Sequence, residues 1–334
     1  MNLGAFPTIH VPDRGPIFRP GGYPTLVSGS PQITSDQASK TVIYYAQDAH
    51  NAFPIIRNGV IHAVYFDEPR LVLSSAHEAN AIYDVFGVER SGNGHIVTGP
   101  KWSNAGAGVG DRGSGGGTTE LTRAAGFYVN RWGIPGLNAD GSVFIAPGEG
   151  TYLFSIFIDG SAGQVTCRVS YGQTRKWALW SAHNKRQIIL KGGDSSASWS
   201  VGGSGSVRAQ NGSSSNSLTS FQGLADGPVA YRLRQAARLV PNQATSAFTG
   251  YVRAGIGYNV TNAYSGKYGQ IDDSISNMPA SMAITQIRDV SGEYIAPAAF
   301  GINTATACES LSNSLSQLLY GTEASCLFTA EWMG

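Results

Sequence analysis

A repeated alternation of apolar and other residues over short stretches is the strongest constraint on the fold. In "TYLFSIFIDG", residues 151–160, positions 152, 154, 156 and 158 fall on one side of an extended chain and positions 153, 155, 157 and 159 on the other. A period of two is typical of β-strands. Dipeptides such as Asn58-Gly59, Asp140-Gly141 and Asp159-Gly160 favour tight turns between such runs. Short strands with frequent turns predict an all-β protein made of sandwich-like or jelly-roll-like domains with few short helices.

The composition supports this fold class and excludes several functions. The chain has 43 glycines among 334 residues, and its net charge of +1 shows no basic excess of the kind nucleic-acid-binding proteins carry. No apolar run approaches the roughly 18 residues of a membrane span. The first residues lack the basic and apolar regions of a signal peptide, so we expect a chain retained in a cytosol. The three cysteines, Cys167, Cys308 and Cys326, form no Cys-x-x-Cys pair and are expected to be free thiols.

Residues 1–40 differ from the rest of the chain. Six of the fifteen prolines fall in this stretch, so it can be neither a helix nor a central strand. We expect an extended arm whose apolar side chains anchor it to another subunit or particle protein. The candidate anchors are Phe6, Ile9, Phe18 and Tyr23. The alternative is that the arm folds back on its own domain.

The remainder is expected to form two β domains, at residues 41–160 and 161–334. In the second, a possible short helix is predicted near 306–320, because Ala307, Leu311, Leu315 and Leu318 would share one face. Residues 229–240 fit either a helix or a strand. As a strand they would bury Tyr231 and Leu233 and align Arg232, Arg234 and Arg238 in a stripe that binds acidic sugars or is a solvated or interface face. The low-complexity segment 191–217 is predicted to hold two strands, near Trp199 and Val207.

The segment 98–123 contains Gly108, Gly110 and Gly113, which spell the G-x-G-x-x-G motif of phosphate-binding loops. That chemistry requires a helix to begin directly after the glycines, so that its N-terminus meets the phosphate. Three consecutive glycines, 115–117, follow instead, and each costs about 1 kcal/mol in a helix. We therefore expect a long loop that returns to a strand at Leu121 and binds no nucleotide.

Other catalytic patterns give no assignment. None of the six histidines lies three or four residues from another, so the helical metal-binding pair is missing. No Gly-x-Ser-x-Gly occurs, which leaves a serine hydrolase without a sequence signal. The carboxylate pairs Asp67-Glu68 and Asp272-Asp273 are typical of turns. We expect no catalytic, cofactor-binding or metal-binding residue and no cofactor.

One longer box is more specific. It consists of Thr98, Gly99, Pro100, Trp102 and Ser103, then Gly117 to Arg123, then Tyr128, Val129 and Asn130. This box resembles a family of tailed-bacteriophage virion proteins with a Thr-Gly-Pro-x-Trp-Ser and Gly-Thr-Thr-Glu-Leu-Thr-Arg signature. Weaker similarity continues in "APGEGTYLFSIF", "RKWALWSAHNK" and "FQGLADGPVAY", so that the resemblance covers roughly residues 44–265.

The resemblance implies a structural or adhesive role in the virion and no catalytic residues. It favours the strand interpretation of residues 228–240. We expect a homotrimeric tail-fibre or head-tail-attached fibre subunit, not an enzyme, assembled in the cytoplasm of the host bacterium. Its partners would be other phage structural proteins of the tail, portal, adaptor or capsid, with a host surface glycan as a further candidate; neither nucleic acid nor membrane insertion is expected. The alternatives are a capsid decoration protein and, from another class, a tailspike-like glycan depolymerase.

Overall fold

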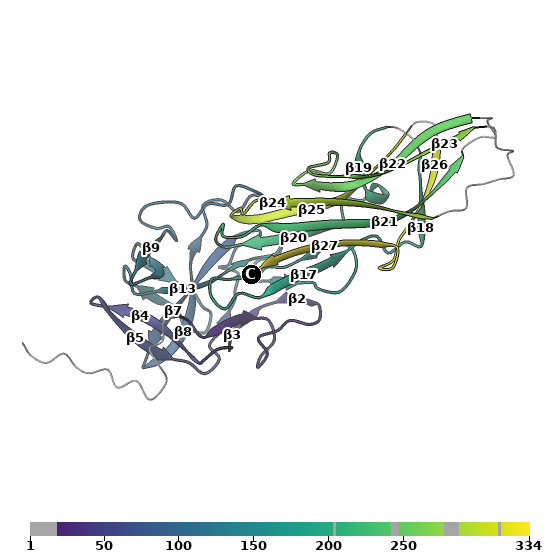
Figure 1. The fold of residues 1–334 in the computed structure, drawn as a ribbon. Helices are drawn as coiled ribbons and strands as arrows, with labels where there is room; N and C mark the ends of the chain where they lie inside the picture. The colour runs from purple at the N-terminus through teal and green to yellow at the C-terminus, as the bar shows by residue number, and fades with distance from the viewer. Residues whose placement is uncertain (1–18, 203–204, 242–246, 277–286, 313–314) are drawn as a thin grey trace, which may run out of the picture.

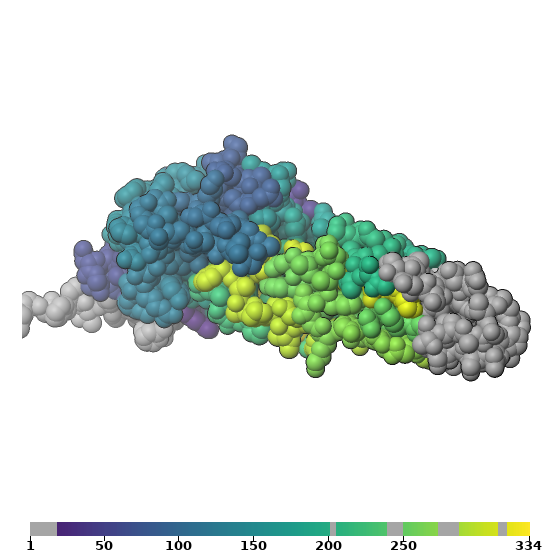
Figure 2. Space-filling model, turned by 90° about the horizontal axis from the view of Figure 1, so that it is seen from above, coloured from purple at the N-terminus to yellow at the C-terminus, as the bar shows by residue number. Residues whose placement is uncertain are grey.

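The fold is all-β, as the alternation predicts. The computed structural model describes residues 19–202, 205–241, 247–276, 287–312 and 315–334, which contain 27 strands and one short 3-10 helix, η1 (Gln210–Gly212). The molecule is elongated: the N-terminal sheets form one end, and a sandwich of long strands projects from them (Figures 1 and 2). No helix in the described part is long and apolar enough to cross a membrane.

The N-terminal half is organised around one antiparallel sheet in the order β8-β7-β13-β10-β9, with β16 paired to β13. Its strands are β7 (Ile82–Arg90), β8 (Asn93–Lys101), β9 (Leu121–Ala124), β10 (Phe127–Asn130), β13 (Thr151–Phe157) and β16 (Leu179–Ser181). Strand β13 lies in the centre of this sheet and is buried on both faces, because Phe154 and Ile156 join one hydrophobic cluster and Tyr152 joins another. A bulge between Tyr152 and Phe154 interrupts its alternation, so Tyr152 joins the face of Ser155 instead of that of Phe154.

Smaller sheets pack around this one. A three-stranded sheet has the order β1-β3-β6, two hairpins are formed by β4 with β5 and β11 with β12, and β2 pairs with β14. Their bounds are β1 (Gly22–Thr25), β2 (Gln37–Lys40), β3 (Val42–Gln47), β4 (Ala52–Arg57), β5 (Val60–Tyr65), β6 (Arg70–Val72), β11 (Ile134–Gly136), β12 (Val143–Ile145) and β14 (Val165–Cys167). Tyr45 fixes the packing between these layers, because its ring stacks on Phe154 at 5.8 Å and meets the edge of Phe53 at 6.5 Å.

The C-terminal sandwich consists of two six-stranded sheets. The first has the order β15-β20-β25-β22-β23 with β19 paired to β25: β15 (Arg175–Lys176), β19 (Arg208–Ala209), β20 (Ser217–Gln222), β22 (Ala247–Tyr258), β23 (Gly269–Ser276) and β25 (Gly301–Leu311). The second has the order β17-β27-β21-β26-β18 with β24 paired to β21: β17 (Gln187–Gly192), β18 (Ser198–Gly202), β21 (Val229–Pro241), β24 (Arg288–Ala296), β26 (Leu315–Tyr320) and β27 (Cys326–Met333). Their inner faces bury Leu218, Tyr231, Ile256 and Phe328.

The ambiguous segment 229–240 is a strand, β21. Tyr231, Leu233 and Ala237 are buried in the core, while Arg232 and Arg234 point outward and are exposed. This is the period-two arrangement, and the family resemblance favoured the same interpretation. The two strands expected in the low-complexity segment are also present, as β18 around Trp199 and β19 directly after Val207.

The helix predicted near 306–320 is wrong, because this segment forms strands β25 and β26. In β25, Ala305 and Ala307 enter the main core, whereas Thr306 and Cys308 are buried on the opposite side. Both faces of the strand are covered, and the alternation of Thr304 and Thr306 with Ala305 and Ala307 is a weak signal beside the helical spacing of the alanine and leucines. Pairing with β20 and β22 on its two edges outweighs the local preference of the alanines and leucines for a helix.

The predicted division between residues 160 and 161 does not coincide with a break in the fold. Strands β14 and β16, which follow residue 160, pair with β2 and β13 of the N-terminal sheets, whereas β15 between them pairs with β20 of the sandwich. One hydrophobic core also runs from Leu26 in the first half to Trp332 in the second. The three cysteines are free and buried, as expected.

Candidate functional site

The glycine-rich segment is a loop between β8, which ends at Lys101, and β9, which begins at Leu121. This confirms the expected return to a strand at Leu121, and no helix follows the glycines. The loop lies against the start of strand β25. The Gly108 N–H donates to the Ile302 carbonyl at 3.1 Å, and a side chain added at Gly110 would come within 2.9 Å of the Gly301 Cα. The glycines therefore allow close backbone contact between the two halves of the molecule.

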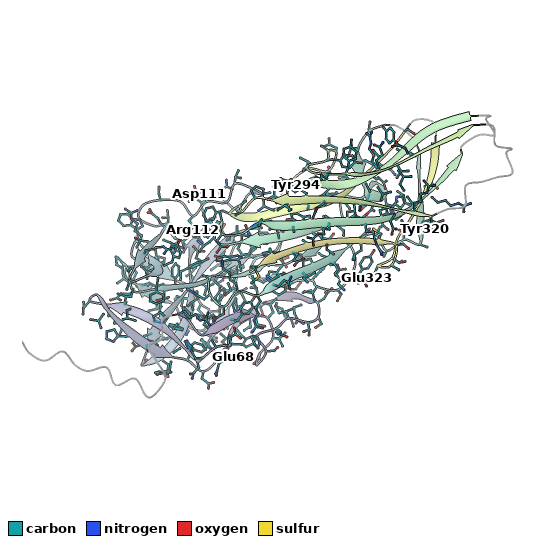
Figure 3. The ribbon with its side chains drawn as sticks, in the orientation of Figure 1. Glu68, Asp111, Arg112, Tyr294, Tyr320 and Glu323 are labelled. Atoms are coloured by element: carbon teal, nitrogen blue, oxygen red, sulfur yellow. The ribbon has the colours of Figure 1, made fainter. Side chains whose placement is uncertain are left out.

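Arg112 projects from this loop into the junction of the two halves (Figure 3). Its Nε and Nη2 donate to the two Asp84 carboxylate oxygens at 2.6 and 3.0 Å. Nη2 also reaches the Tyr152 hydroxyl at 3.3 Å and the Gly223 carbonyl, in the sandwich half, at 2.6 Å. The guanidinium lies 4.4 Å from the ring centroid of Trp102. One side chain thus joins the loop, the N-terminal sheet and the sandwich.

Asp84, in β7, is completely buried and fully satisfied. Besides Arg112 it accepts hydrogen bonds from Ser155 Oγ at 2.6 Å and Thr119 Oγ1 at 3.2 Å. Ser155 in turn shares a 2.6 Å hydrogen bond with Tyr152, which the bulge in β13 brings to the same face. Burial alone would favour a neutral Arg112, but the Asp84 carboxylate outweighs it and raises the Arg112 pKa. Burial raises the pKa of Tyr152, so this hydroxyl stays protonated.

This arrangement is that of a structural ion pair. Asp84 accepts four internal hydrogen bonds, two of them from Arg112, and Ser155 Oγ donates to it, so neither the Asp84 carboxylate nor the Ser155 hydroxyl is available as a base or nucleophile. Sequence reasoning missed the cluster. The available signals were one arginine in a run of small residues and one aspartate within the apolar stretch "AIYDVFG".

Tyr23 is the one predicted anchor within the described residues, and it does not lie on an exposed arm. It belongs to β1, is 3% exposed, and donates a 3.1 Å hydrogen bond to the Gly334 carbonyl. The Arg186 guanidinium covers its ring at 4.9 Å. From residue 19 onward the predicted arm therefore folds onto its own chain, as in the alternative interpretation. The other three anchors, Phe6, Ile9 and Phe18, lie outside the described residues.

Two of the histidines and two residues of the acidic pairs occupy structural positions. Burial lowers the pKa of His77 and holds that of His183 at about 4. Glu68 stabilises a turn by accepting a hydrogen bond from Ser28 Oγ at 2.6 Å. Asp272 lies within strand β23, so its assignment to a turn was wrong. In the part of the chain that the structure describes, no group of three or more His, Cys, Asp or Glu residues could hold a metal ion.

A second buried polar network holds the low-complexity segment. Asn211 donates its side-chain N–H to Asp194 at 3.0 Å and its backbone N–H to Glu309 at 3.2 Å. Glu309 also accepts from Trp199 Nε1 at 3.0 Å and forms an ion pair with Arg208 at 2.8 Å. These carboxylates are occupied by internal donors. Parts of segment 191–217 are therefore fixed within the sandwich.

Comparison with protein-family models and with curated proteins gives no match to this chain. The structure nonetheless gives the Thr98–Arg123 box a place in the fold. Within it, Trp102 stacks on Arg112, Thr119 bonds to Asp84, and Thr98 hydrogen-bonds to the Leu137 backbone. These box residues support the joint between the two halves.

Proposed function

We propose that this protein is a virion structural protein of a tailed bacteriophage, a homotrimeric fibre subunit of the tail or the head-tail junction. The observation that carries the proposal is the position of the Thr98–Arg123 box. The stretch that resembles phage virion proteins packs around the Arg112–Asp84 pair, where it braces an elongated all-β body. A shared segment that braces the body, with its charged groups internally satisfied, suits a structural family better than an enzymatic one.

The hairpin of β4 and β5 supports attachment at the N-terminal end. Within the described residues β5 pairs only with β4, so its outer edge has no strand partner. The strand "VIHAVY" contains no Lys, Arg, Asp, Glu or Pro, and Val60, Ile61 and Tyr65 are exposed by 38 to 47%. Edges without such protective residues invite pairing with another chain. We therefore assign this edge to contact with a neighbouring subunit or particle protein.

The described part of the chain begins beside this hairpin. The Gly21 N–H donates to the Ala52 carbonyl at 2.8 Å, so the chain passes β4 as it enters the described part. The first described residues thus lie at the same end as the open β5 edge. This position supports docking of the arm on the particle, with the sandwich projecting outward as a candidate for contact with the host surface.

Labelled electron microscopy of purified phage tests the proposal. Gold-labelled antibody against this protein is expected at the tail or at one vertex, and light scattering of the purified protein is expected to give a trimer. Labels spread over the whole capsid would support a decoration protein instead. Particles that carry no label, or release of reducing sugar from host polysaccharide by the purified protein, would overturn the proposal.

A further inference from the structure

We propose that the outer face of β22 and β23 binds an acidic polysaccharide, with Arg253 as the residue that recognises its carboxylate groups. The inference rests on the proposed function, because it names the kind of host molecule that the sandwich would contact. Arg253 contacts Gln270, Tyr251 and Tyr268, and its Nε is the only guanidinium nitrogen for which the described residues supply a hydrogen-bond acceptor.

Arg253 is held in place by its neighbours on the sheet. Its Nε donates to Gln270 Oε1 across the β22–β23 pair, and Gln270 Nε2 donates to Asp272 Oδ1 at 2.5 Å. The guanidinium lies 3.9 Å from the ring centroid of Tyr251 and 5.0 Å from that of Tyr268. Stacking between two rings and one side-chain hydrogen bond restrict the rotamers that the side chain would otherwise sample, so little entropy remains to be lost on binding.

Among the residues that the structure describes, the two terminal nitrogens of Arg253 remain available. In the described part of the chain, no carboxylate forms an ion pair with this arginine, whereas Arg112, Arg208 and Arg232 all do. A planar guanidinium with free terminal N–H groups matches a carboxylate through two parallel hydrogen bonds. Arg253 is therefore preorganised to bind an external anion through its terminal nitrogens.

The neighbouring tyrosines form a supported platform. Tyr264 stacks on Tyr268 with ring centroids 5.0 Å apart, and its hydroxyl donates to Ser310 Oγ at 3.0 Å. Gly255 permits this, because a side chain there would lie 2.6 Å from the Tyr264 ring. Tyr268 remains 44% exposed. An exposed ring beside a fixed guanidinium suits a sugar whose apolar face stacks on the tyrosine while its acid group meets the arginine.

A hollow of about 790 Å³ continues from Tyr268 onto the other sheet. Its walls carry three cationic side chains, one carboxylate, two hydroxyl groups and two leucines: Arg232, Arg234, Lys267, Glu293, Ser291, Thr329, Leu233 and Leu327. Arg232 is tied to Glu293 at 3.2 Å, but the exposed Lys267 ammonium has no ion-pair partner within the described ranges. The hollow offers polar contacts for further sugar units, so a polymer fits this surface better than a single acidic monosaccharide.

The test measures binding of the purified full-length protein to three acidic glycans (oligogalacturonate, oligosialic acid and hyaluronan oligomers) by calorimetry. A neutral maltooligosaccharide and inorganic sulfate serve as ligand controls. We expect binding to at least one acidic glycan, none to the neutral one, and affinity that falls with added salt. Binding to sulfate with the same affinity as to the best acidic glycan would contradict the role of the tyrosine platform. Failure to bind all three acidic glycans would overturn the inference.

The variants separate recognition from stability. Arg253→Ala is expected to lower the affinity about tenfold or more, Arg253→Lys by less, and Tyr268→Ala severalfold. The matched control is Arg123→Ala, because Arg123 also stacks on a tyrosine, Tyr128, at 4.5 Å, but in the N-terminal half. Equal affinity of the Arg253→Lys, Arg253→Ala and control proteins would overturn the inference. Gold labelling tests the virion location separately, so glycan binding and virion membership can fail independently.

Discussion

Replacement of Arg112 by methionine should destabilise the whole molecule, because it leaves the Asp84 carboxylate buried without its cation. Asp84 is 0% exposed and would lose two of its four hydrogen bonds, and the Gly223 carbonyl would lose the Arg112 donor. Breaking a buried ion pair at one partner costs about 3 to 5 kcal/mol. With an unfolding entropy of roughly 0.7 kcal/mol/K for a chain of this length, Tm should fall by about 4 to 7 °C.

Arg70→Met provides the matched control. Its Nε lies 2.6 Å from Asp140 Oδ2, the same distance as between Arg112 and Asp84, but the arginine side chain is 62% exposed instead of 10%. Exposed pairs contribute less than about 1 kcal/mol, so this variant should melt close to the wild type. Differential scanning calorimetry and urea titration measure both proteins. An equal decrease in the free energy of unfolding of both variants, or a decrease below about 1 kcal/mol in Arg112→Met, would refute the assignment of the joint to a buried ion pair.

The remaining predictions concern the loop, a histidine and the arm. Gly110→Ala should destabilise the protein by forcing the loop away from β25, whereas Gly116→Ala, which faces open space, should be close to neutral; thermal melts compare the two. Burial lowers the His183 pKa to about 4, so the folded protein favours the neutral imidazole. The free energy of unfolding should therefore be insensitive to this group above pH 6.5 and fall by up to roughly 3 kcal/mol as the pH drops toward 4. His183→Gln should flatten that slope in urea titrations at several pH values. Deletion of residues 1–18 should leave a folded oligomer, shown by light scattering, that is missing from virions, while normal incorporation would place the anchor elsewhere. Calorimetry with ATP and NAD should show no micromolar affinity for segment 98–123.

The fold class could be predicted from the sequence because alternation and turn dipeptides are local signals. The return of the glycine-rich loop at Leu121 followed from such patterns. The pattern of residues 229–240 fitted a helix as well as strand β21, and only the family resemblance favoured the strand. Strand β25 could not be predicted in this way, because both its faces are buried and small residues such as Ala305 and Cys308 give no contrast between them. Its conformation depends on the partners that flank it, which lie far away in the sequence.

The Arg112–Asp84 joint shows a second limit. Asp84 and Arg112 are 28 residues apart, Gly223 follows another 111 residues later, and no local pattern connects them. The bulge that turns Tyr152 toward Ser155 also broke the alternation from which its face was inferred. The family resemblance indicated the box as special but assigned no role to its individual residues.

The glycine-rich segment connects these observations. Its G-x-G-x-x-G spacing is shared with phosphate-binding loops because both need a backbone that another group can approach closely. In this protein the approaching group is the start of β25, through Gly301 and Ile302, and its backbone contacts the loop backbone directly. Close approach of the backbones places Arg112 beside the buried Asp84. The same arginine bonds to Gly223, so the buried ion pair joins both halves. The motif therefore predicts close backbone contact, and only the helix that would follow it, which is missing here, makes such a contact a phosphate site.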